Sequence, residues 1–411
     1  MMPARYRVSL MLFVTIGINY LDRSNLAVVA PALGHDLSLN ARQMGWIFSA
    51  FGWSYAALQI PGGWLADRIS ARVLGALVCL LWSAATIMQG FAGTFLALFL
   101  LRLLLGAFEA PTFPVCNRVT SLWYGENERA RATSFFITGE FVGVAVFTFV
   151  LRLLEKDWGW PAVFFATGGF GLVWAAVWYA RYRDPPPSER TAADRAAADR
   201  PAASSGGFRW ADFKLVLMNR TLLGIYAGQF SVSATLWFFL TWFQPYLGYR
   251  HFNLVTAGWV GALPFCGACV GVWTAGWISD FLLKRGFSFN VARKAPIIAG
   301  LLFSSLIVGA NYVQNPILVA LFLSLALFGT GCSSITWVLV AAVAPRRLVG
   351  LAGGTFNFFG NLASIFVPIA IGFLIRGENF VPALRLMGAI ALAGALCYLF
   401  VVGKIESRTA S

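Results

Sequence analysis

The chain has 411 residues, of which 59% are hydrophobic and only 12% are charged. Together with a mean hydropathy of +0.72, this composition excludes an ordinary soluble domain and places the chain in a lipid bilayer. The net charge of +14 could point to nucleic acid, but the positions of the basic residues, given below, exclude such a partner.

Apolar segments recur from end to end, and each is about 20 residues long, enough to cross a hydrocarbon core of about 30 Å. We count about twelve of them. Their centres are near Ile18, Trp53, Leu81, Leu105, Val142, Phe170, Ser233, Cys269, Leu306, Leu327, Phe359 and Ala391. The sequence therefore predicts an all-α membrane protein with about twelve transmembrane helices.

The basic residues are distributed unevenly between the two sides of the membrane. If the N-terminus is cytoplasmic, 23 of the 31 Lys and Arg residues fall on the cytoplasmic side and six on the other, while Arg23 and Arg102 stay within the membrane. This positive-inside asymmetry predicts a multi-pass protein with both termini in the cytoplasm. We expect it in the plasma membrane, here a bacterial inner membrane, and as a monomer.

The first predicted helix carries an acid and a base side by side, Asp22 and Arg23, within the polar segment from Asn19 to Asn25. A charged residue at membrane depth costs roughly 2.5 to 3.5 kcal/mol even on lenient insertion scales. Charges kept at that cost usually have a role, so we interpret the chain as a membrane transporter.

The fourth predicted helix carries Arg102 and Glu109, seven residues and thus two turns apart. They share one face, about 10 Å apart along the axis, and we expect both to face the transport cavity. Arg23 and Arg102 each offer a planar fork that can bind a carboxylate through two parallel hydrogen bonds. The alternative is that Asp22, Arg23, Arg102 and Glu109 form only a structural ion-pair network.

A long polar interval, residues 183–214, contains three consecutive prolines and an Ala/Arg/Asp-rich run. We interpret it as a cytoplasmic linker between two halves of about six helices, residues 1–182 and 215–411. The connection after the second helix is alike in both halves. Its shared features are Gly62, Asp67, Arg68 and Arg72 in the first half and Gly276, Asp280 and Arg285 in the second. Such a parallel repeat predicts two pseudo-symmetric halves.

These motifs resemble known families. The loop from Gly62 to Arg72 resembles that of the major facilitator superfamily, and the likeness extends over the whole chain. More narrowly, four segments resemble the anion/cation symporter family, whose bacterial members include galactonate, glucarate and hexuronate proton symporters. These segments run from Asn19 to Asn25, from Arg102 to Pro114, from Glu128 to Ala132 and from Phe356 to Ala363.

The resemblance implies a secondary active transporter that imports a hydroxylated organic anion by proton symport with alternating access. Arg23 resembles the ligand of the substrate carboxylate, and Asp22 and Glu109 resemble the proton-coupling acids. Arg102 is a further candidate for substrate binding. Positions that resemble the substrate-lining residues of sugar-acid symporters are Tyr20, Tyr55, Ser334, Thr336, Trp337 and Asn357. For each of these six, helix packing is the alternative role.

Glu140 departs from the family pattern, because sugar-acid relatives usually carry Gln at the matching position of the fifth helix. An additional acid in the membrane would repel a second substrate carboxylate, bind a hydroxyl or an amine, or add a protonatable site. It could equally pair with an arginine. Glu140 is therefore a candidate for both substrate binding and proton coupling.

Coupling between substrate and proton follows from local electrostatics. Burial favours the neutral form of an acid, whereas a neighbouring arginine favours the carboxylate. An anionic substrate that occupies the arginine would therefore promote proton uptake by the acid, and by reciprocity the proton would strengthen substrate binding.

The remaining residues offer little other chemistry. The six cysteines lie in apolar segments, and the two histidines, His35 and His251, lie near predicted outer loops. We therefore expect no disulfide framework, no metal site and no cofactor other than the proton as coupling ion. The sequence has no P-loop or nucleophile–base pair, so we expect no enzyme. The remaining alternatives are a proton-coupled exporter or antiporter of an aromatic or amphipathic compound, and a ligand sensor on a transporter scaffold.

Overall fold

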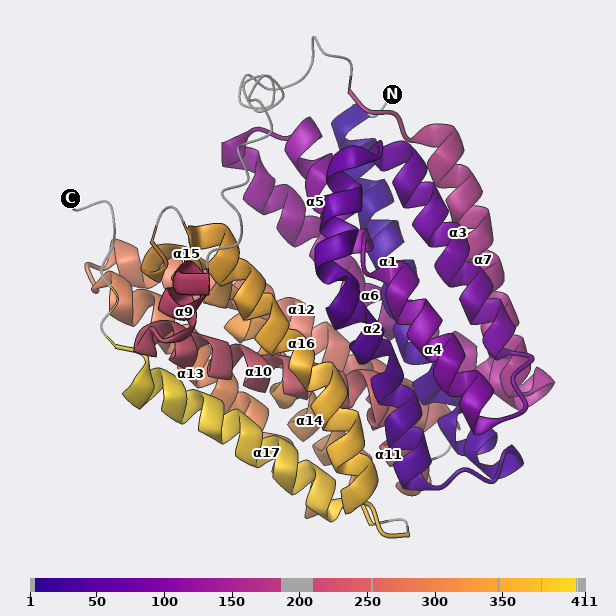
Figure 1. The fold of residues 1–411 in the computed structure, drawn as a ribbon. Coiled ribbons are helices and arrows are strands. Elements are labelled where there is room, and N and C mark those ends of the chain that lie inside the picture. The colour runs from indigo at the N-terminus through magenta and orange to yellow at the C-terminus, as the bar shows by residue number, and fades with distance from the viewer. Residues whose placement is uncertain are drawn as a thin grey trace. The chain divides into compact units, whose positions relative to one another are not determined.

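The computed structural model describes residues 4–185, 210–252, 254–345, 348–377, 379–403 and 405. Contacts within the chain divide it into two compact units, unit 1 (Met1–Gly206) and unit 2 (Gly207–Ser411) (Figure 1). Of the predicted linker, residues 186–209 lie outside the described residues, and residues 210–214 are the start of helix α9 (Trp210–Leu217).

Unit 1 is built from helices that pack in pairs. In the part of it that is described they are α1 (Ala4–Asp36), α2 (Ala41–Arg68), α3 (Ala71–Gln89), α4 (Phe95–Glu109), α5 (Thr112–Trp123), α6 (Glu126–Trp158) and α7 (Trp160–Arg181). The closest pairs are α1 with α6, α2 with α4 and α3 with α7. Helices α4 and α5 form one membrane-crossing segment that is interrupted at Ala110 and Pro111, because proline lacks the N–H that a continuous helix needs.

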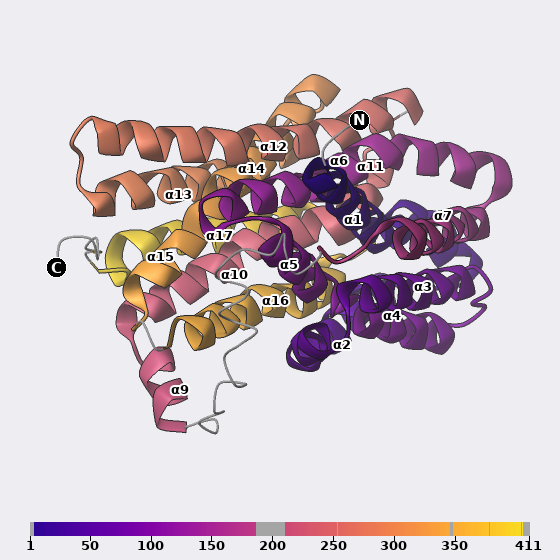
Figure 2. The ribbon, with the colours of Figure 1, turned by 90° about the horizontal axis from the view of Figure 1, so that it is seen from above.

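Unit 2 repeats this arrangement. After α9 its described helices are α10 (Arg220–Thr241), α11 (Phe243–Tyr249), α12 (Leu254–Lys284), α13 (Phe289–Ser305), η1 (Leu306–Asn311), α14 (Pro316–Cys332), η2 (Ser333–Ile335), α15 (Thr336–Val343), α16 (Val349–Leu374), α17 (Val381–Leu396) and η4 (Cys397–Val401). Helix α12 packs mainly against α14 and α10 against α16, and α13 packs against both α14 and α17; Figure 2 shows α10 beside α16. In both units the first crossing segment packs on the fifth, the second on the fourth and the third on the sixth. The two predicted pseudo-symmetric halves are confirmed.

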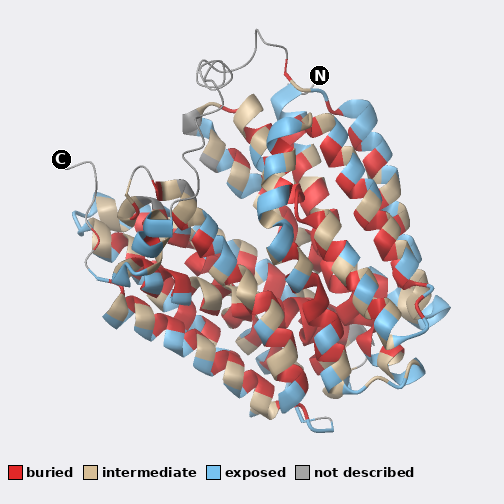
Figure 3. Cartoon of the chain, in the orientation of Figure 1, coloured by how far each residue is buried: buried red, intermediate tan, exposed pale blue. Residues whose placement is uncertain are grey.

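The predicted number of membrane-crossing helices is also confirmed. Ten helical segments of the described chain are long and apolar enough to span a membrane. Helices α1, with 33 residues, and α2, with 28, are also long enough, and they complete the twelve. Exposed residues recur along the helices of both units (Figure 3), and large apolar side chains are among them, for example Val173 (62%) and Trp273 (72%). Exposed apolar surface on this scale fits a protein surrounded by lipid.

Glycines bring α1 and α6 into backbone contact beside the polar segment of α1. A Cβ atom at Gly143 would lie 2.6 Å from the carbonyl oxygen of Gly17, and one at Gly139 would collide with the carbonyl oxygen of Phe13. Small residues permit this close approach of membrane helices. The contact holds α6, which carries Glu140, against the helix that carries Asp22 and Arg23.

The repeated loop motif is held by different contacts in the two units. In unit 1, Gly62 lies against the fourth crossing segment, where α4 and α5 meet, and its Cβ position is 3.0 Å from the nitrogen of Pro111. Arg118 donates hydrogen bonds to the carbonyl oxygens of Ala66 and Ile69, at the end of α2. In unit 2 the space beside Gly276 is open.

The charged members of the motif also differ. In unit 1 the side chain of Asp67 is exposed, the Arg68 guanidinium lies 4.1 Å from the Trp64 ring, and Arg72 donates to the carbonyl oxygen of Tyr179 at 2.8 Å. In unit 2, Asp280 pairs with Arg293 at 3.5 Å, and the Arg285 guanidinium lies 4.9 Å from the Phe281 ring. The sequence pattern is shared, but its partners are not.

Candidate functional site

A buried ion pair joins α1 to α4 in unit 1. The Nε atom of Arg23 donates to Oε2 of Glu109 at 2.9 Å, and the side chains are 3% and 0% exposed. Nη2 of Arg23 and Oε1 of Glu109 have no hydrogen-bond partner in the described residues. The Nη2 group is therefore buried beside Tyr55 and can still donate a hydrogen bond to a further acceptor.

Three aromatic rings surround the guanidinium of Arg23. Its central carbon lies 4.6 Å from the ring centre of Tyr20, 4.9 Å from that of Phe51 and 4.7 Å from that of Tyr55. Phe51 and Tyr55 stack on each other at 5.1 Å. The electron-rich ring faces attract the cation and fix the plane of its fork. The predicted residues Tyr20, Tyr55 and Arg23 thus meet in one cluster, which also includes Phe51.

Arg102 also turns toward α1, but it contacts the backbone. It donates to the carbonyl oxygens of Asp22 and Arg23, at 3.3 Å each, and is 1% exposed. Arg102 therefore ties α4 to α1 beside the ion pair, while Glu109 reaches the side chain of Arg23. The two residues share a face of α4, as their spacing predicts, and both side chains reach α1.

Asp22 is the most isolated acid of the site. It is fully buried, and neither carboxylate oxygen has a hydrogen-bond partner within the described chain. Trp82 on α3 and Thr167 on α7 lie beside it, and it interacts electrostatically with Glu109 and Arg102. The Asp22 carboxyl is therefore buried beside the indole N–H of Trp82 and the hydroxyl of Thr167, close to the charged groups of α4.

Glu140 approaches the same arginine from α6. It is 7% exposed, lies beside the Tyr20 hydroxyl and interacts electrostatically with Arg23. Glu140 thus lies near Arg23 and the Tyr20 hydroxyl, and its roles in substrate binding and proton coupling stay predictions. The site brings three acids, Asp22, Glu109 and Glu140, together with two arginines.

Among the candidates of unit 2, Thr336 is engaged in the interior. Its hydroxyl donates to the carbonyl oxygen of Ser333 at 2.6 Å and accepts from the Tyr398 hydroxyl at 3.4 Å, and the residue is 1% exposed. In this structure its hydroxyl serves helix packing.

The other three candidates of unit 2 are exposed. They are Ser334, Trp337 and Asn357, and they lie on the neighbouring elements η2, α15 and α16. Trp337 is 48% exposed and packs edge-on against Phe356 at 4.7 Å. A hydroxyl, an indole and an amide are thus exposed on these elements of unit 2.

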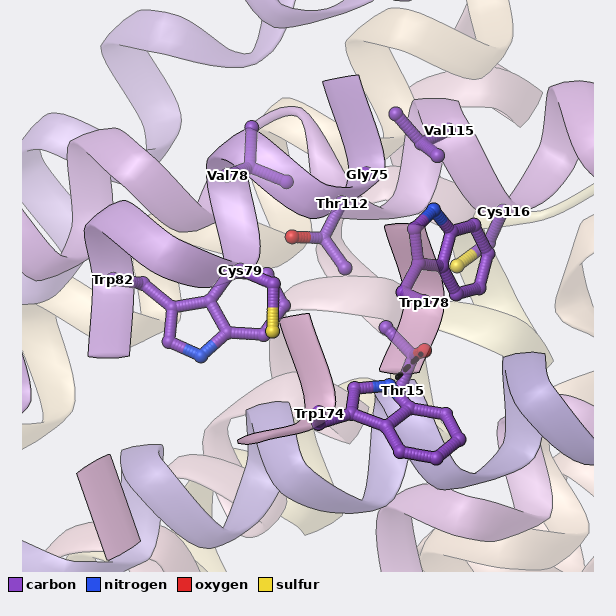
Figure 4. Close-up of a pocket in the computed structure, with 10 residues that line it drawn as sticks. All are labelled: Thr15, Gly75, Val78, Cys79, Trp82, Thr112, Val115, Cys116, Trp174 and Trp178. Carbon is purple, nitrogen blue, oxygen red and sulfur yellow. Dashed lines mark hydrogen bonds between the residues drawn. The ribbon is translucent and has the colours of Figure 1, made fainter. Parts of the chain in front are cut away.

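A small cavity lies within unit 1, between α1, α3, α5 and α7 (Figure 4). The volume open to the centre of a water-sized sphere is about 10 Å³, which is room for about one water molecule. Its lining includes Cys79, Trp82 and Thr112. The cavity is far too small for a sugar-sized ligand.

Several polar residues of the site were not among the predicted site residues. Asn19 is fully buried with both side-chain atoms unpartnered, and Asn25 donates to the Thr167 hydroxyl at 3.0 Å. The signal for both was their position in an apolar helix beside Asp22. Phe51 could have been found from its spacing of four residues from Tyr55, which places the two on one helix face.

All six cysteines are free, and within the described residues no cluster of three or more His, Cys, Asp or Glu side chains could hold a metal ion. The charged groups of the site are therefore those of α1, α4 and α6.

Solved structures share this fold. A bacterial homologue of the human lysosomal transporter Spinster, in an inward-facing unoccupied conformation, matches with a TM-score of 0.71 and 19% identity, over 98% of this chain and 95% of that one. The nucleoside transporter NupG matches with a TM-score of 0.70 and 12% identity, over 96% and 100%. At these identities the likeness concerns the fold alone.

Sequence comparison identifies closer relatives. A D-galactonate transporter of Escherichia coli O6:H1 is 42% identical over 98% of this chain and 96% of its own length. The probable galactarate/D-glucarate transporters GarP of Escherichia coli K12 and GudP of Bacillus subtilis are each 38% identical, over 98% of this chain and 95% and 92% of theirs. Residues 12–292 match the family model of the Major Facilitator Superfamily. The family match, the nearly full-length relatives and the shared fold all point to transporters rather than enzymes. This chain is therefore a multi-pass membrane transporter of the major facilitator superfamily.

Proposed function

We propose that the protein imports a sugar acid with a single carboxylate by proton symport, with alternating access of its site. The observation that carries this proposal is the buried Arg23–Glu109 pair, in which Nη2 of the arginine has no partner. The relatives named as D-galactonate and galactarate/D-glucarate transporters support the substrate class.

The ion pair suggests how substrate and proton are coupled. A substrate carboxylate can first accept from Nη2 of Arg23, and when it binds the Nε–Nη2 edge through two hydrogen bonds it takes the Nε–H that now faces Glu109. When Glu109 gives up that hydrogen bond, its carboxylate is left buried and unpaired, which favours its protonation. Substrate binding then promotes proton uptake, and proton uptake at Glu109 frees Arg23 for the substrate.

The charges of the site favour more than one proton. Three ionised acids and two arginines leave one net negative charge, and a bound monocarboxylate adds a second. Two protons make the loaded site neutral, and we assign them to Glu109 and to Asp22, which are both fully buried. Import would then carry one net positive charge inward with each substrate molecule.

Glu140 selects between sugar acids in this proposal. Its carboxyl lies beside Arg23 and Tyr20, so it can accept hydrogen bonds from substrate hydroxyls. The second carboxylate of a dicarboxylic sugar acid such as galactarate would meet a like charge there. We therefore expect a preference for a monocarboxylate such as D-galactonate. In unit 2, Ser334, Trp337 and Asn357 are the exposed groups suited to hydroxyls.

The topology follows from the distribution of basic residues. We place both termini in the cytoplasm and the protein in a bacterial inner membrane, where an inward proton gradient is present. The internal repeat of two similar six-helix units is the arrangement with which transporters expose one site alternately to the two sides.

Uptake into proteoliposomes tests the proposal. Labelled D-galactonate should accumulate above its external concentration when the outside is more acidic, and an inside-negative potential should increase the uptake further. Excess unlabelled galactarate should compete poorly. Uptake that ignores the acid gradient would argue against proton symport, and equal competition by galactarate would argue against the assigned substrate class.

A further inference from the structure

A row of buried polar groups follows one face of α3. Trp82, Ser83, Thr86 and Gln89 are each 0% exposed. Nε1 of Trp82, the hydroxyls of Ser83 and Thr86, and Oε1 of Gln89 have no hydrogen-bond partner in the described chain. The transport chemistry proposed above uses none of these four residues.

The row begins beside Asp22. Trp82 lies next to the Asp22 carboxyl, and both Asp22 and Asn19 on α1 carry polar atoms without partners. Helix α7 packs against both α1 and α3 and adds Thr167 next to Asp22. Unpartnered donors and acceptors therefore gather where these three helices meet.

The small cavity adjoins Trp82 on the side of Thr15, Thr112 and Trp174. Figure 4 shows Trp82 and Thr112 at its wall, and Nε1 of Trp82 and the Thr112 hydroxyl are both unpartnered. A space of about one water molecule with two polar partners is the setting in which proteins bind buried water. Buried polar groups without a protein partner are commonly satisfied in this way.

We infer that unit 1 contains a water-lined proton route to Asp22. The route starts at Gln89, passes Thr86 and Trp82 along α3, and is separate from the side of the site where Arg23 binds the substrate. The inference rests on the proposed proton symport. A proton passes between hydrogen-bonded waters and is accepted by the Asp22 carboxylate, with no other bond made or broken. The substrate uses Arg23, so proton and substrate enter separately.

The spacing on α3 suits such a route. Gln89, Thr86 and Trp82 are three and four residues apart, so they share one face with rises of about 4.5 and 6 Å, which one or two waters bridge. Gln89 is the last residue of α3, at the end away from Arg72. By the positive-inside rule this is the outer end, from which protons enter in symport.

The charged and titratable groups around Asp22 are compatible with this role. They are Arg23 on α1, Cys79 on α3, and Arg102 and Glu109 on α4. Arg102 donates to the carbonyl oxygen of Asp22 and leaves its carboxyl oxygens without a donor. The carboxyl is therefore open toward Trp82 and Thr167.

Two substitutions on α3 test the route through transport. Thr86→Val keeps the shape and removes the hydroxyl, and Gln89→Leu removes the amide. Each should slow acid-driven accumulation of labelled D-galactonate at least fivefold, leave substrate counterflow unchanged and leave the melting temperature unchanged or higher. Thr274→Val is the control, because Thr274 is a membrane-helix threonine of α12 whose hydroxyl bonds only its own helix, at Val270. Wild-type rates in both α3 variants would overturn the route.

A second measurement does not depend on transport. Hydroxyl radicals generated by X-rays from bound water should oxidise Trp82 at least fivefold faster than Trp242, which is also buried but donates its indole N–H to the carbonyl oxygen of Pro368. Equal, slow oxidation of both tryptophans would overturn the water site. If Trp82 is labelled but wild-type uptake ignores the acid gradient, the proposed symport fails while the buried water stands.

Discussion

Replacing Arg23 by lysine should abolish most substrate binding although the positive charge is kept. The arginine offers two parallel donors on one edge, and three aromatic rings within 4.6 to 4.9 Å hold its plane. A lysine ammonium is a point charge that cannot reproduce this fork. The change therefore isolates the geometry of the site from its charge.

The size of the effect follows from the lost hydrogen bond. A hydrogen bond to a charged group contributes about 1.5 to 3 kcal/mol. Losing one of two such bonds to the substrate carboxylate should raise the dissociation constant roughly 10- to 150-fold, at about 1.4 kcal/mol per tenfold. The pair with Glu109, now 2.9 Å long, should weaken similarly, so acid-driven uptake should fall as well.

Calorimetry of D-galactonate binding to the purified transporter in nanodiscs measures this change. Arg285→Lys is the matched control, because Arg285 stacks on Phe281 at 4.9 Å and is outside the proposed site. Its variant should bind like wild type. An affinity of Arg23→Lys within about threefold of wild type, with a normal melting temperature, would remove Arg23 from the substrate site.

Three further changes test separate parts of the structure. Glu109→Gln mimics a permanently protonated acid, so acid-driven accumulation should be lost while substrate counterflow survives; accumulation at the wild-type level would assign coupling to another acid. Glu140→Gln should improve competition by galactarate roughly 30-fold, because the repulsion between Glu140 and the second carboxylate of galactarate is removed. Like charges about 8 Å apart interact by about 2 kcal/mol at an effective dielectric of about 20. Unchanged competition would contradict the selectivity argument. Gly62→Ala places a methyl group 3.0 Å from Pro111 and should lower stability by about 1 to 3 kcal/mol, whereas Gly63→Ala, with open space beside it, should leave the melting temperature unchanged or slightly higher in a thermal-shift assay.

The fold could be predicted well because the length and hydropathy of an apolar segment identify a membrane helix. Helix α1 was found although its polar segment makes it less apolar, and the repeated loop after α2 revealed the two halves. The break before Pro111 is also readable from sequence. The partners of the two equivalent loops differ, because Arg118 and Arg293 bind them through unrelated contacts. No local sequence pattern predicts these contacts.

The site was predicted in part. The spacing of Arg102 and Glu109 correctly placed them on one helix face, but periodicity cannot say which helix covers that face. The contact of Arg102 with backbone carbonyl oxygens could not be predicted from the sequence, because every residue carries such an oxygen and none is distinguished by its residue type. Ser83, Thr86 and Gln89 have helical spacing within an apolar segment, which indicates a shared helix face. Because none of them is charged, the sequence gives no strong signal that this face is functional.

The separation of Arg23 and Glu109 in the chain has a consequence for biosynthesis. The two partners are 86 residues apart, and at ribosomal rates of about 5 to 20 residues per second the glutamate is synthesised ~4 to 17 s after the arginine. During that interval α1 carries a charge at membrane depth that its later partner has yet to neutralise. The first helix therefore depends on the insertion machinery or on a water-filled surrounding until α4 arrives, and a ribosome that stalls between them would leave a helix poorly suited to lipid.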